Sequence, residues 1–277
     1  MNYGYYNGEI APLETLKAPV LDRAFYFGDG VYDVTTFVNG RYFALTDHYE
    51  RFISSCRLAD IKFDMSMDEL KTVFDRLVEL TKPEGDALVY FQASRATGER
   101  KHSYGDDEKA NLFAYVKPIK RVDMFEHVKL ITEPDIRFEM CNIKTLNLMP
   151  NVLANKKAEK AGCYEAVFHR GDIVTEGSHS SVMLIKDGAV IIPPLSKYIL
   201  PSITRKYVAL LCDRHNIKLK ISTFTLDELF SADEILVGSA SSMVRRASHI
   251  DGIACGGKAT ELYTKLANVY YDCYVNG

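Results

Sequence analysis

The stretch Cys141-Asn142-Ile143-Lys144-Thr145-Leu146-Asn147-Leu148-Met149-Pro150 places one lysine among apolar side chains. An ammonium group held against apolar walls is disfavoured, so such a lysine tends to lose its proton and become a nucleophile. A neutral amine is what a lysine needs to form a Schiff base with a carbonyl compound. The alternative is an ordinary amphipathic lysine, whose stem packs on the core while its head reaches water. This stretch alone favours the second interpretation, so a catalytic role for Lys144 depends on evidence from the rest of the chain.

Regular elements are predicted on both sides of Lys144. A strand is predicted over 128–133, and a helix over 150–162, since proline suits the first helical turn and glycine its end. The second half continues with hairpins over 165–174 and 182–192, helices that start near 203 and 225, and a strand over 235–237.

Strands and tight turns dominate the first part of the chain. Asn7-Gly8 and Asn39-Gly40 stand between strand-like residues. Because Asn-Gly tolerates the positive φ angles of a type I′ turn, each pair predicts a β-hairpin. The glycines at 28 and 30 predict a tight backbone feature at the entry to a strand. Two longer strands are predicted over 87–96 and 112–116.

Two capping patterns predict helices between these strands. Ser66 with Glu69 forms a full capping box before an apolar pattern of helical period, and Asp47 with Glu50 forms a similar pair. The fold class is therefore α+β, or mixed α/β, with two domains. We expect an N-terminal α+β domain over 1–118 and a C-terminal domain over 119–277 that contains Lys144.

Composition limits the classes of function. The chain has 277 residues, 47% of them hydrophobic, and a net charge of −3 without long runs of one sign, so nucleic-acid binding is not expected. No uncharged apolar run spans a bilayer, and the start carries no signal-peptide pattern. Six scattered cysteines, none at metal-ligand spacing, read as free thiols. We expect a cytoplasmic protein without a membrane or metal site.

Three further places carry groups that suit anions. Arg51 lies in a predicted helix, where a solvated surface arginine is the usual case. The loop over 97–105 contains Arg100, Lys101 and His102, which can trap a carboxylate or simply stay solvated. The helix start at Ile203-Thr204 offers free N–H groups and a favourable dipole, although most helix starts bind only water.

Together these stretches resemble the fold-type IV pyridoxal-phosphate enzymes, the class IV aminotransferases and their relatives. The resemblance runs along almost the whole chain. Its markers are short, but all five occur in the same order and at the same spacing as in the family. Within the group the chain is most similar to the D-amino-acid aminotransferases, because Arg100-Lys101-His102 fits their Arg-x-His loop. The markers are Phe27-Gly28-Asp29-Gly30-Val31-Tyr32, Asp47-His48-Tyr49-Glu50-Arg51, Ile143-Lys144-Thr145-Leu146-Asn147, Thr175-Glu176-Gly177-Ser178 and Ile203-Thr204-Arg205.

The resemblance implies a pyridoxal 5′-phosphate cofactor and the residues that handle it. Lys144 would hold the cofactor as an internal aldimine and later move the proton at the substrate Cα. Glu176 would face the pyridine nitrogen and favour its protonated form, which makes the ring an electron sink. The phosphate would be held by Arg51, Ile203 and Thr204, with the turn at Ser239 and Ala240.

The resemblance also implies how substrate is bound and how the chain assembles. Tyr32, Arg100 and His102 would receive the substrate carboxylate, and the loop that carries the last two would come from a neighbouring subunit. A homodimer with shared active sites is therefore expected. The predicted reaction exchanges an amino group between a D-amino acid and a 2-oxo acid.

Some residues depart from the family pattern and keep alternatives open. Thr36 replaces a frequent lysine, Ala240 replaces a frequent hydroxyl residue, and Arg245-Arg246 replaces a more usual Pro-Val-type sequence. The alternatives are a branched-chain L-amino-acid aminotransferase, an aminodeoxychorismate lyase, and a binding protein that kept the fold without catalysis. The presence of both Lys144 and Glu176 argues against the last.

Overall fold

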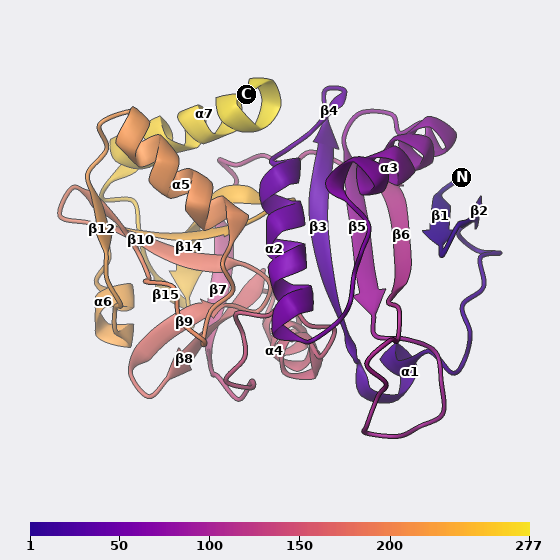
Figure 1. Cartoon of the computed structure of the whole chain (residues 1–277). Helices are drawn as coiled ribbons and strands as arrows, with labels where there is room; N and C mark the ends of the chain where they lie inside the picture. The colour runs from indigo at the N-terminus through magenta and orange to yellow at the C-terminus, as the bar shows by residue number, and fades with distance from the viewer. The chain divides into compact units, whose positions relative to one another are not determined.

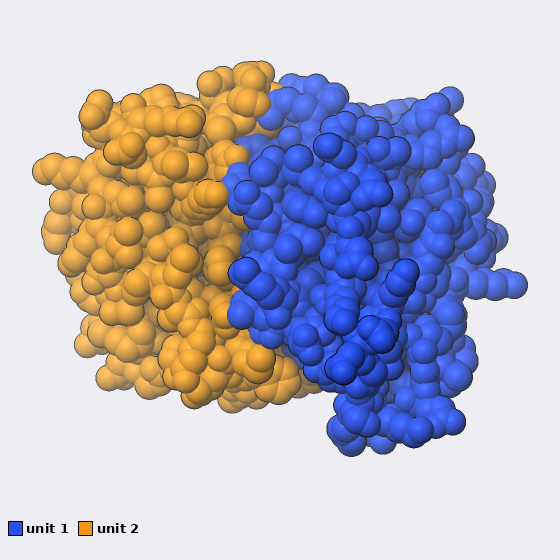
Figure 2. Space-filling model, in the orientation of Figure 1, with its two compact units in different colours: residues 1–121, 143–147 blue, residues 122–142, 148–277 orange.

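The computed structural model describes all 277 residues of the chain, which group into two compact units. Unit 1 comprises residues 1–121 and 143–147, and unit 2 comprises residues 122–142 and 148–277 (Figure 2). Lys144 belongs to unit 1, although the residues on both sides of its short segment belong to unit 2. None of the helices is both long enough and apolar enough to cross a membrane.

Unit 1 is built on a six-stranded sheet with the strand order β2-β1-β6-β5-β3-β4 (Figure 1). Every neighbouring pair of strands is antiparallel. The elements of this unit are β1 (Tyr3–Tyr6), β2 (Glu9–Pro12), α1 (Arg23–Phe27), β3 (Gly30–Val38), β4 (Arg41–Tyr42), α2 (Leu45–Leu58), α3 (Met67–Thr81), β5 (Ala87–Ser94) and β6 (Asn111–Pro118).

Both Asn-Gly hairpins predicted in unit 1 are confirmed. Asn7 and Gly8 have φ angles of 44° and 100° and connect β1 to β2. Asn39 and Gly40, with φ angles of 48° and 81°, connect β3 to β4 in the same way. Positive φ at both central positions is the type I′ geometry, which matches the twist of the paired strands.

The two predicted capping patterns have different outcomes. The capping box at α3 is confirmed, since the Ser66 hydroxyl accepts from the Glu69 N–H and the Glu69 carboxylate accepts from the Ser66 N–H. The predicted cap at Asp47 is wrong. Helix α2 begins at Leu45, after Ala44 in the left-handed region at φ 50°, and no side chain caps it. Asp47 instead lies in the first turn, where its charge favours the helix dipole.

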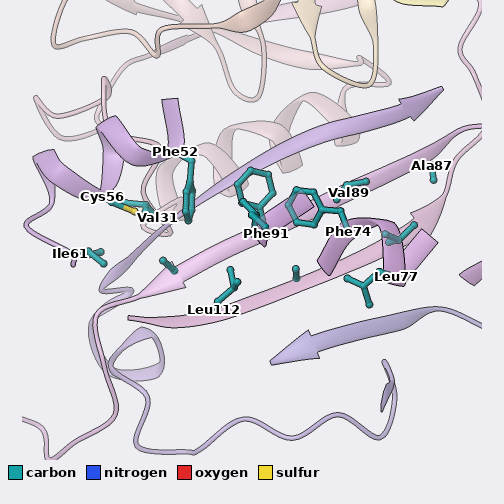
Figure 3. Close-up of a cluster of buried hydrophobic side chains, with 14 of the residues drawn as sticks. Val31, Phe52, Cys56, Ile61, Phe74, Leu77, Ala87, Val89, Phe91 and Leu112 are labelled. Atoms are coloured by element: carbon teal, nitrogen blue, oxygen red, sulfur yellow. The ribbon is translucent and has the colours of Figure 1, made fainter. Parts of the chain in front are cut away.

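Helices α2 and α3 bury one face of this sheet. Phe52 of α2, Phe74 of α3 and Phe91 of β5 lie side by side in the core (Figure 3), with ring centroids 4.9 and 5.0 Å apart. All three rings are fully buried. Tilted aromatic contacts at such distances stabilise a core beyond the area they bury.

The opposite face of the same sheet carries a row of half-buried aromatic rings. Tyr32 stacks on Tyr90 at 5.6 Å between ring centroids, and Tyr90 stacks on Tyr115 at 5.1 Å. Phe113 extends the row, with its centroid 5.7 Å from that of Tyr115. Because side chains alternate along a strand, these rings point away from the face that α2 and α3 cover.

Unit 2 is built on a nine-stranded mixed sheet. Eight strands follow the order β12-β11-β10-β13-β14-β7-β8-β9, and β15 pairs with β14. The strands are β7 (Val128–Pro134), β8 (Glu165–Arg170), β9 (Ile173–Gly177), β10 (Ser181–Lys186), β11 (Ala189–Ile192), β12 (Leu219–Ile221), β13 (Glu234–Ser239), β14 (Met243–Ile250) and β15 (Ile253–Ala254). The helices are α4 (Met149–Lys160), α5 (Ile203–Arg214), α6 (Leu226–Phe230) and α7 (Thr260–Asn276).

The local predictions for unit 2 are confirmed in outline. Helix α4 has Pro150 in its first turn, and Gly162 follows its end at φ 67°. The β10–β11 hairpin turns at Asp187 and Gly188, and the β8–β9 hairpin turns at Gly171. A mixed α/β chain, as predicted, results from these two sheets and their helices.

Candidate active site

The Lys144 segment is hydrogen-bonded to the start of β3 as a short extra strand. The Lys144 carbonyl accepts from the Tyr32 N–H at 2.9 Å, and the Leu146 N–H donates to the Gly30 carbonyl at 3.0 Å. A Cβ at Gly30 would lie 2.6 Å from the Leu146 side chain and 2.7 Å from a carbonyl oxygen of β5. The glycine is therefore required for this close approach.

The amine of Lys144 lies against an aromatic ring. Its Nζ is 4.3 Å from the ring centroid of Tyr32, and the side chain is half-buried. The backbone N–H of Lys144 donates to the Ser55 hydroxyl of α2 at 3.1 Å. The structure thus brings together two predicted site residues, Lys144 and Tyr32, and fixes the lysine backbone from two sides.

Arg51 is paired with a fully buried carboxylate. Its Nε and Nη2 donate to the two oxygens of Asp33, each at 2.8 Å, and the Asp33 side chain has no exposed surface. His48 Nδ1 lies 2.8 Å from the same carboxylate. Although burial alone raises the pKa of Asp33, the charges of Arg51 and the bond to His48 hold it well below its usual range. The marker Asp47–Arg51 contains His48 and Arg51 but not Asp33, so the sequence does not reveal this cluster.

His48, the third residue of this cluster, has one ring nitrogen on Asp33 and one that is buried without a partner. Burial lowers the pKa of His48, and the opposing effect of the Asp33 carboxylate does not compensate. The ring is therefore neutral, and the bond to Asp33 requires the proton on Nδ1. The other nitrogen, Nε2, is buried without a hydrogen-bond partner. A buried acceptor of this kind is costly unless a ligand or a water molecule supplies a donor.

Arg100 and His102 lie on an anchored loop. The Arg100 guanidinium is 5.1 Å from the ring centroid of Phe27, and the His102 ring is 5.2 Å from the same ring. Arg23, which is buried, donates to the Lys101 carbonyl at 2.6 Å and to the Asp29 carboxylate at 2.8 Å. The loop therefore holds Arg100 and His102 together on one ring, and both side chains are exposed.

In unit 2, Glu176 lies in β9, one residue before the end of the strand, as a buried carboxylate held on both oxygens. Arg137 Nη1 donates to Oε1 at 2.5 Å, and the backbone N–H of Leu200 donates to Oε2 at 2.9 Å. Glu176 is 7% exposed, which leaves it little contact with water. The fixed orientation of this carboxylate results from Arg137, a residue that sequence reasoning missed.

Arg137 is in turn held by Asp135. Its Nε and Nη2 donate to the two Asp135 oxygens, each at 2.9 Å, and this carboxylate has no exposed side-chain surface. Burial works to lower the pKa of Arg137, but the bonds from Asp135 and the charge of Glu176 outweigh it and raise that pKa above its ordinary value. Arg137 therefore stays charged.

The start of α5 offers backbone donors. Ser202 caps the helix by accepting from the Arg205 N–H at 3.2 Å, and helix geometry leaves the N–H groups of Ile203 and Thr204 without partners inside the helix. The Thr204 side chain is buried, at 2% exposure. Its donor toward an anion is therefore the backbone N–H.

The predicted turn at Ser239 and Ala240 lies at the end of β13. The Ser239 hydroxyl is 2.7 Å from the Ser242 hydroxyl and also accepts from the Ser242 N–H, so it stabilises the turn itself. The preceding Gly238 packs directly on α5, because a Cβ there would lie 2.7 Å from Thr204 Cγ2. The turn and the start of α5 are therefore held together.

The residues present fit pyridoxal phosphate. An aldehyde requires an amine, and Lys144 provides one beside an aromatic face. A pyridine nitrogen that is to stay protonated requires a carboxylate, and Glu176 is buried with a fixed orientation. A phosphate group requires several donors, and the start of α5 presents free amides beside a glycine that keeps a Cβ away.

Comparison with known proteins agrees with this set of residues. Residues 30–250 match the family described as amino-transferase class IV. The D-alanine aminotransferase of Staphylococcus aureus (strain N315) is 39% identical over 251 residues, which cover 90% of this chain and 89% of that protein. The D-alanine aminotransferase of Staphylococcus haemolyticus is 37% identical over 274 residues, which cover 98% and 97%.

A solved structure shows the same fold. The branched-chain aminotransferase of Thermoproteus uzoniensis, crystallised with norvaline, superposes with a TM-score of 0.89 over 98% of this chain and 93% of that one. Its sequence is only 22% identical, so this likeness concerns the fold alone. The expected fold-type IV architecture is thereby confirmed. The chain belongs to the class IV aminotransferases, transaminases that depend on pyridoxal phosphate.

Proposed function

We propose that this transaminase exchanges amino groups between D-amino acids and 2-oxo acids. The observation that carries the proposal is the anchored loop on which Arg100 and His102 lie together over one ring. A guanidinium fork and an imidazole in this arrangement suit one carboxylate. The D-alanine aminotransferases that match nearly the whole chain support the same substrate class.

Lys144 is the proposed catalytic base. Its Nζ would remove the proton from the substrate Cα, and the face of the Tyr32 ring beside it limits where the amine moves. Bound pyridoxal phosphate would supply the electron sink for the charge that develops at Cα. Glu176, oriented by Arg137 and the Leu200 N–H, would keep a proton on the ring nitrogen.

The phosphate would be held mainly by hydrogen-bond donors. We assign this role to Arg51 and to the backbone N–H groups of Ile203 and Thr204, with the turn at Ser239 and Ala240 contributing backbone donors. The pair with Asp33 takes two of the five N–H donors of Arg51 and fixes the plane of its guanidinium.

The D preference follows from where the carboxylate is held. Both enantiomers carry the same carboxylate, amine and side chain. Once the carboxylate is fixed, they differ in the direction of the Cα–H, and the site distinguishes them by this direction. With the carboxylate on Tyr32, Arg100 and His102, the Cα–H of the D-enantiomer would face Lys144. A misdirected proton blocks reaction even when binding is good, so the preference belongs to kcat more than to KM.

Arg100 and His102 would serve the site of a second copy of this chain in a homodimer. Both side chains are exposed, and no hydrogen bond or ion pair ties either of them to Lys144 or Tyr32 of the same protomer. The half-buried aromatic row of Tyr32, Tyr90, Tyr115 and Phe113 is a surface that a second copy would cover.

A cytoplasmic location completes the proposal. All six cysteines are free, including two that are buried. Free thiols of this number suit a reducing compartment. Fractionation of the producing cells, with the protein recovered among cytoplasmic markers, tests this expectation.

The substrate class is tested with a panel of amino donors. D- and L-alanine, aspartate, glutamate and leucine are each supplied with pyruvate or 2-oxoglutarate, and the 2-oxo acid product is measured. D-Alanine and D-glutamate should react faster than any L-enantiomer. Faster turnover of L-leucine would move the assignment to a branched-chain L-aminotransferase, and release of pyruvate from aminodeoxychorismate without an acceptor would move it to a lyase.

Shared sites are tested by mixing two inactive variants. A Lys144→Ala subunit keeps its loop, and an Arg100→Ala/His102→Ala subunit keeps its lysine. If the loop serves the neighbouring site, a mixed dimer contains one complete site and the mixture regains activity. A monomer in sedimentation analysis, or a mixture that stays inactive although mixed dimers form, would contradict the shared site.

A further inference from the structure

Glu176 does not stand alone in unit 2 but ends a chain of buried charges. Asp135 holds the Nε and Nη2 edge of Arg137, and Arg137 turns Nη1 to Glu176 at 2.5 Å. The Arg137 guanidinium also lies 4.7 Å from the ring centroid of Phe168, so its plane is packed as well as bonded. Its side chain is only 8% exposed.

We infer that Arg137 is a positioning residue that makes Glu176 selective for a protonated ring nitrogen. The inference rests on the proposed role of Glu176 at the pyridine nitrogen of the cofactor. Arg137 occupies one lone pair of Glu176 Oε1 and the Leu200 N–H occupies one of Oε2. The carboxylate is thereby held in one orientation by a donor on each oxygen, and a fixed orientation is what a ring N–H donor requires.

The charges of the cluster agree with this role. Asp135 and Glu176 each carry one negative charge, and Arg137 and Arg170, which both bond to Asp135, each carry one positive charge, so the charges of the cluster balance. Asp135 is needed for this balance, because without it the two arginines would outweigh the single negative charge of Glu176. Burial raises the pKa of Asp135, but the hydrogen bonds and charge of Arg137 outweigh this and lower it, so Asp135 stays ionised.

Removing the guanidinium would leave Asp135 and Glu176 without the cation they share. Asp135 would keep Arg170, but Glu176 would lose its bonded cation, and a buried carboxylate in that situation favours uptake of a proton. A protonated Glu176, no longer fixed by Nη1, would lose both the charge and the direction that a pyridinium requires. Arg137→Met keeps a side chain of similar length and removes the donors together with the positive charge.

Arg170 provides a matched control within the same cluster. Its Nε donates to Asp135 at 3.1 Å and its Nη2 donates to the Arg137 carbonyl at 2.8 Å, but it does not contact Glu176. Arg170→Met therefore disturbs the same segment and the same aspartate while leaving the Arg137–Glu176 bond in place. A purely structural effect should appear in both variants.

The experiment measures the affinity of the cofactor-free dimer for two ligands. One is pyridoxal phosphate and the other is its analogue with C–H in place of the ring nitrogen, which cannot bond to Glu176. Wild type should prefer the natural cofactor. Arg137→Met should lower this preference about tenfold or more, which is the range for one hydrogen bond to a charged partner. Arg170→Met should leave the preference unchanged.

Different outcomes separate the inference from the proposed function. Equal weakening for both ligands in Arg137→Met would show a structural role only and overturn the inference. A wild type without preference would instead overturn the role of Glu176, and a wild type that binds neither ligand would overturn the cofactor site. If circular dichroism shows that Arg137→Met does not fold, Arg137→Lys replaces it, since lysine keeps the charge but lacks the fork. A smaller loss of preference then supports the inference, and an unchanged preference refutes it.

Discussion

The two units hold an arginine in the same way and present it to different partners. Arg51 in unit 1 and Arg137 in unit 2 both direct Nε and Nη2 to an aspartate without exposed surface. The aspartate Asp33 also binds a neutral histidine, His48. The arginine Arg137, by contrast, binds a second carboxylate, that of Glu176.

The difference shows how one motif can suit opposite charges. In unit 1 the charge of Arg51 is balanced by Asp33, so an anion is attracted by oriented N–H donors more than by net charge. In unit 2 the third residue is the carboxylate of Glu176, which is proposed to face a cation, while Arg170, bonded to Asp135, brings the cluster to two negative and two positive charges. The shared part of both clusters orients an arginine, and the proposed difference in ligand follows the third residue, a neutral histidine in unit 1 and a carboxylate in unit 2.

The largest effect on activity is expected from a substitution that removes the reactive amine and leaves both clusters intact. Lys144→Ala should lower transamination by about a hundredfold to ten-thousandfold, the usual contribution of a positioned base. The midpoint of thermal unfolding should stay close to that of wild type, since only a half-buried side chain is truncated. Borohydride should no longer attach the cofactor to the protein. Activity near the wild-type value would refute the assignment of Lys144.

The next effect concerns the stability that each cluster contributes. Asp33→Asn and Asp135→Asn each remove the charged partner from a buried arginine–aspartate pair, which typically costs about 3–5 kcal/mol of the free energy of unfolding. Urea unfolding of the cofactor-free protein measures both losses. A loss in one variant only would show that the two clusters are alike in geometry but not in energy.

A third arginine, Arg100, is exposed and has no buried aspartate. Arg100→Ala should lower kcat/KM for D-alanine by a factor that corresponds to about 1.5–3 kcal/mol, the contribution of a charged hydrogen bond. The absorbance of the bound cofactor should not change, because Arg100 is proposed to contact substrate only. Full activity of this variant with D-alanine would contradict the carboxylate role.

The comparison itself is tested by cofactor affinity in the two asparagine variants. Asp33→Asn removes the negative charge beside Arg51 and should raise the affinity for pyridoxal phosphate. Asp135→Asn leaves the positive charge of Arg137 to Glu176 alone and should lower that affinity. Each change should be about tenfold, a fraction of the ~4 kcal/mol between unit charges 4 Å apart at an effective dielectric constant of 20. Changes of the same sign would refute the proposed division between anion and cation clusters.

The smallest effect is a difference in acid sensitivity between the units. Burial lowers the pKa of folded His48, whereas the unfolded chain takes up this proton near pH 6.5. Unit 1 should therefore lose stability as the pH falls below about 6.5. The pKa of Asp135 is also lowered, against the raising effect of burial, so its contribution is complete above about pH 4 and lost only below it.

Hydrogen exchange measured separately for the two units between pH 7 and 5 checks this difference. Amides of unit 1 should lose protection first, and His48→Gln should remove that early loss. Equal sensitivity of both units in wild type would mean that His48 does not determine the acid response.

Local chemistry made part of the fold predictable from the sequence. Asn-Gly pairs and the Ser66–Glu69 box act within a few residues, so their geometry depends little on the rest of the chain. The start of α2 could not be predicted in this way. Ala44 adopts a positive φ, which alanine does not favour by itself, so tertiary packing determines the helix start.

The same distinction applies to the candidate site. Lys144, Glu176 and Arg100 could be identified because they stand in short markers of characteristic composition. Arg137 could not be, because its partner Glu176 is 39 residues away and Asp135-x-Arg137 is a common spacing without a motif. Likewise Arg51 was identified without its aspartate, since 18 residues separate the two.

The membership of residues 143–147 in unit 1 has a consequence for synthesis of the chain. The start of β3 bonds to Lys144 and Leu146, so its edge stays open until those residues have left the ribosome. Domains fold in order of emergence where they can, but here more than a hundred residues separate the two partners. A nascent chain stalled at residue 121 would therefore expose a strand edge. The segment that carries the reactive amine is also the segment that closes the fold of unit 1.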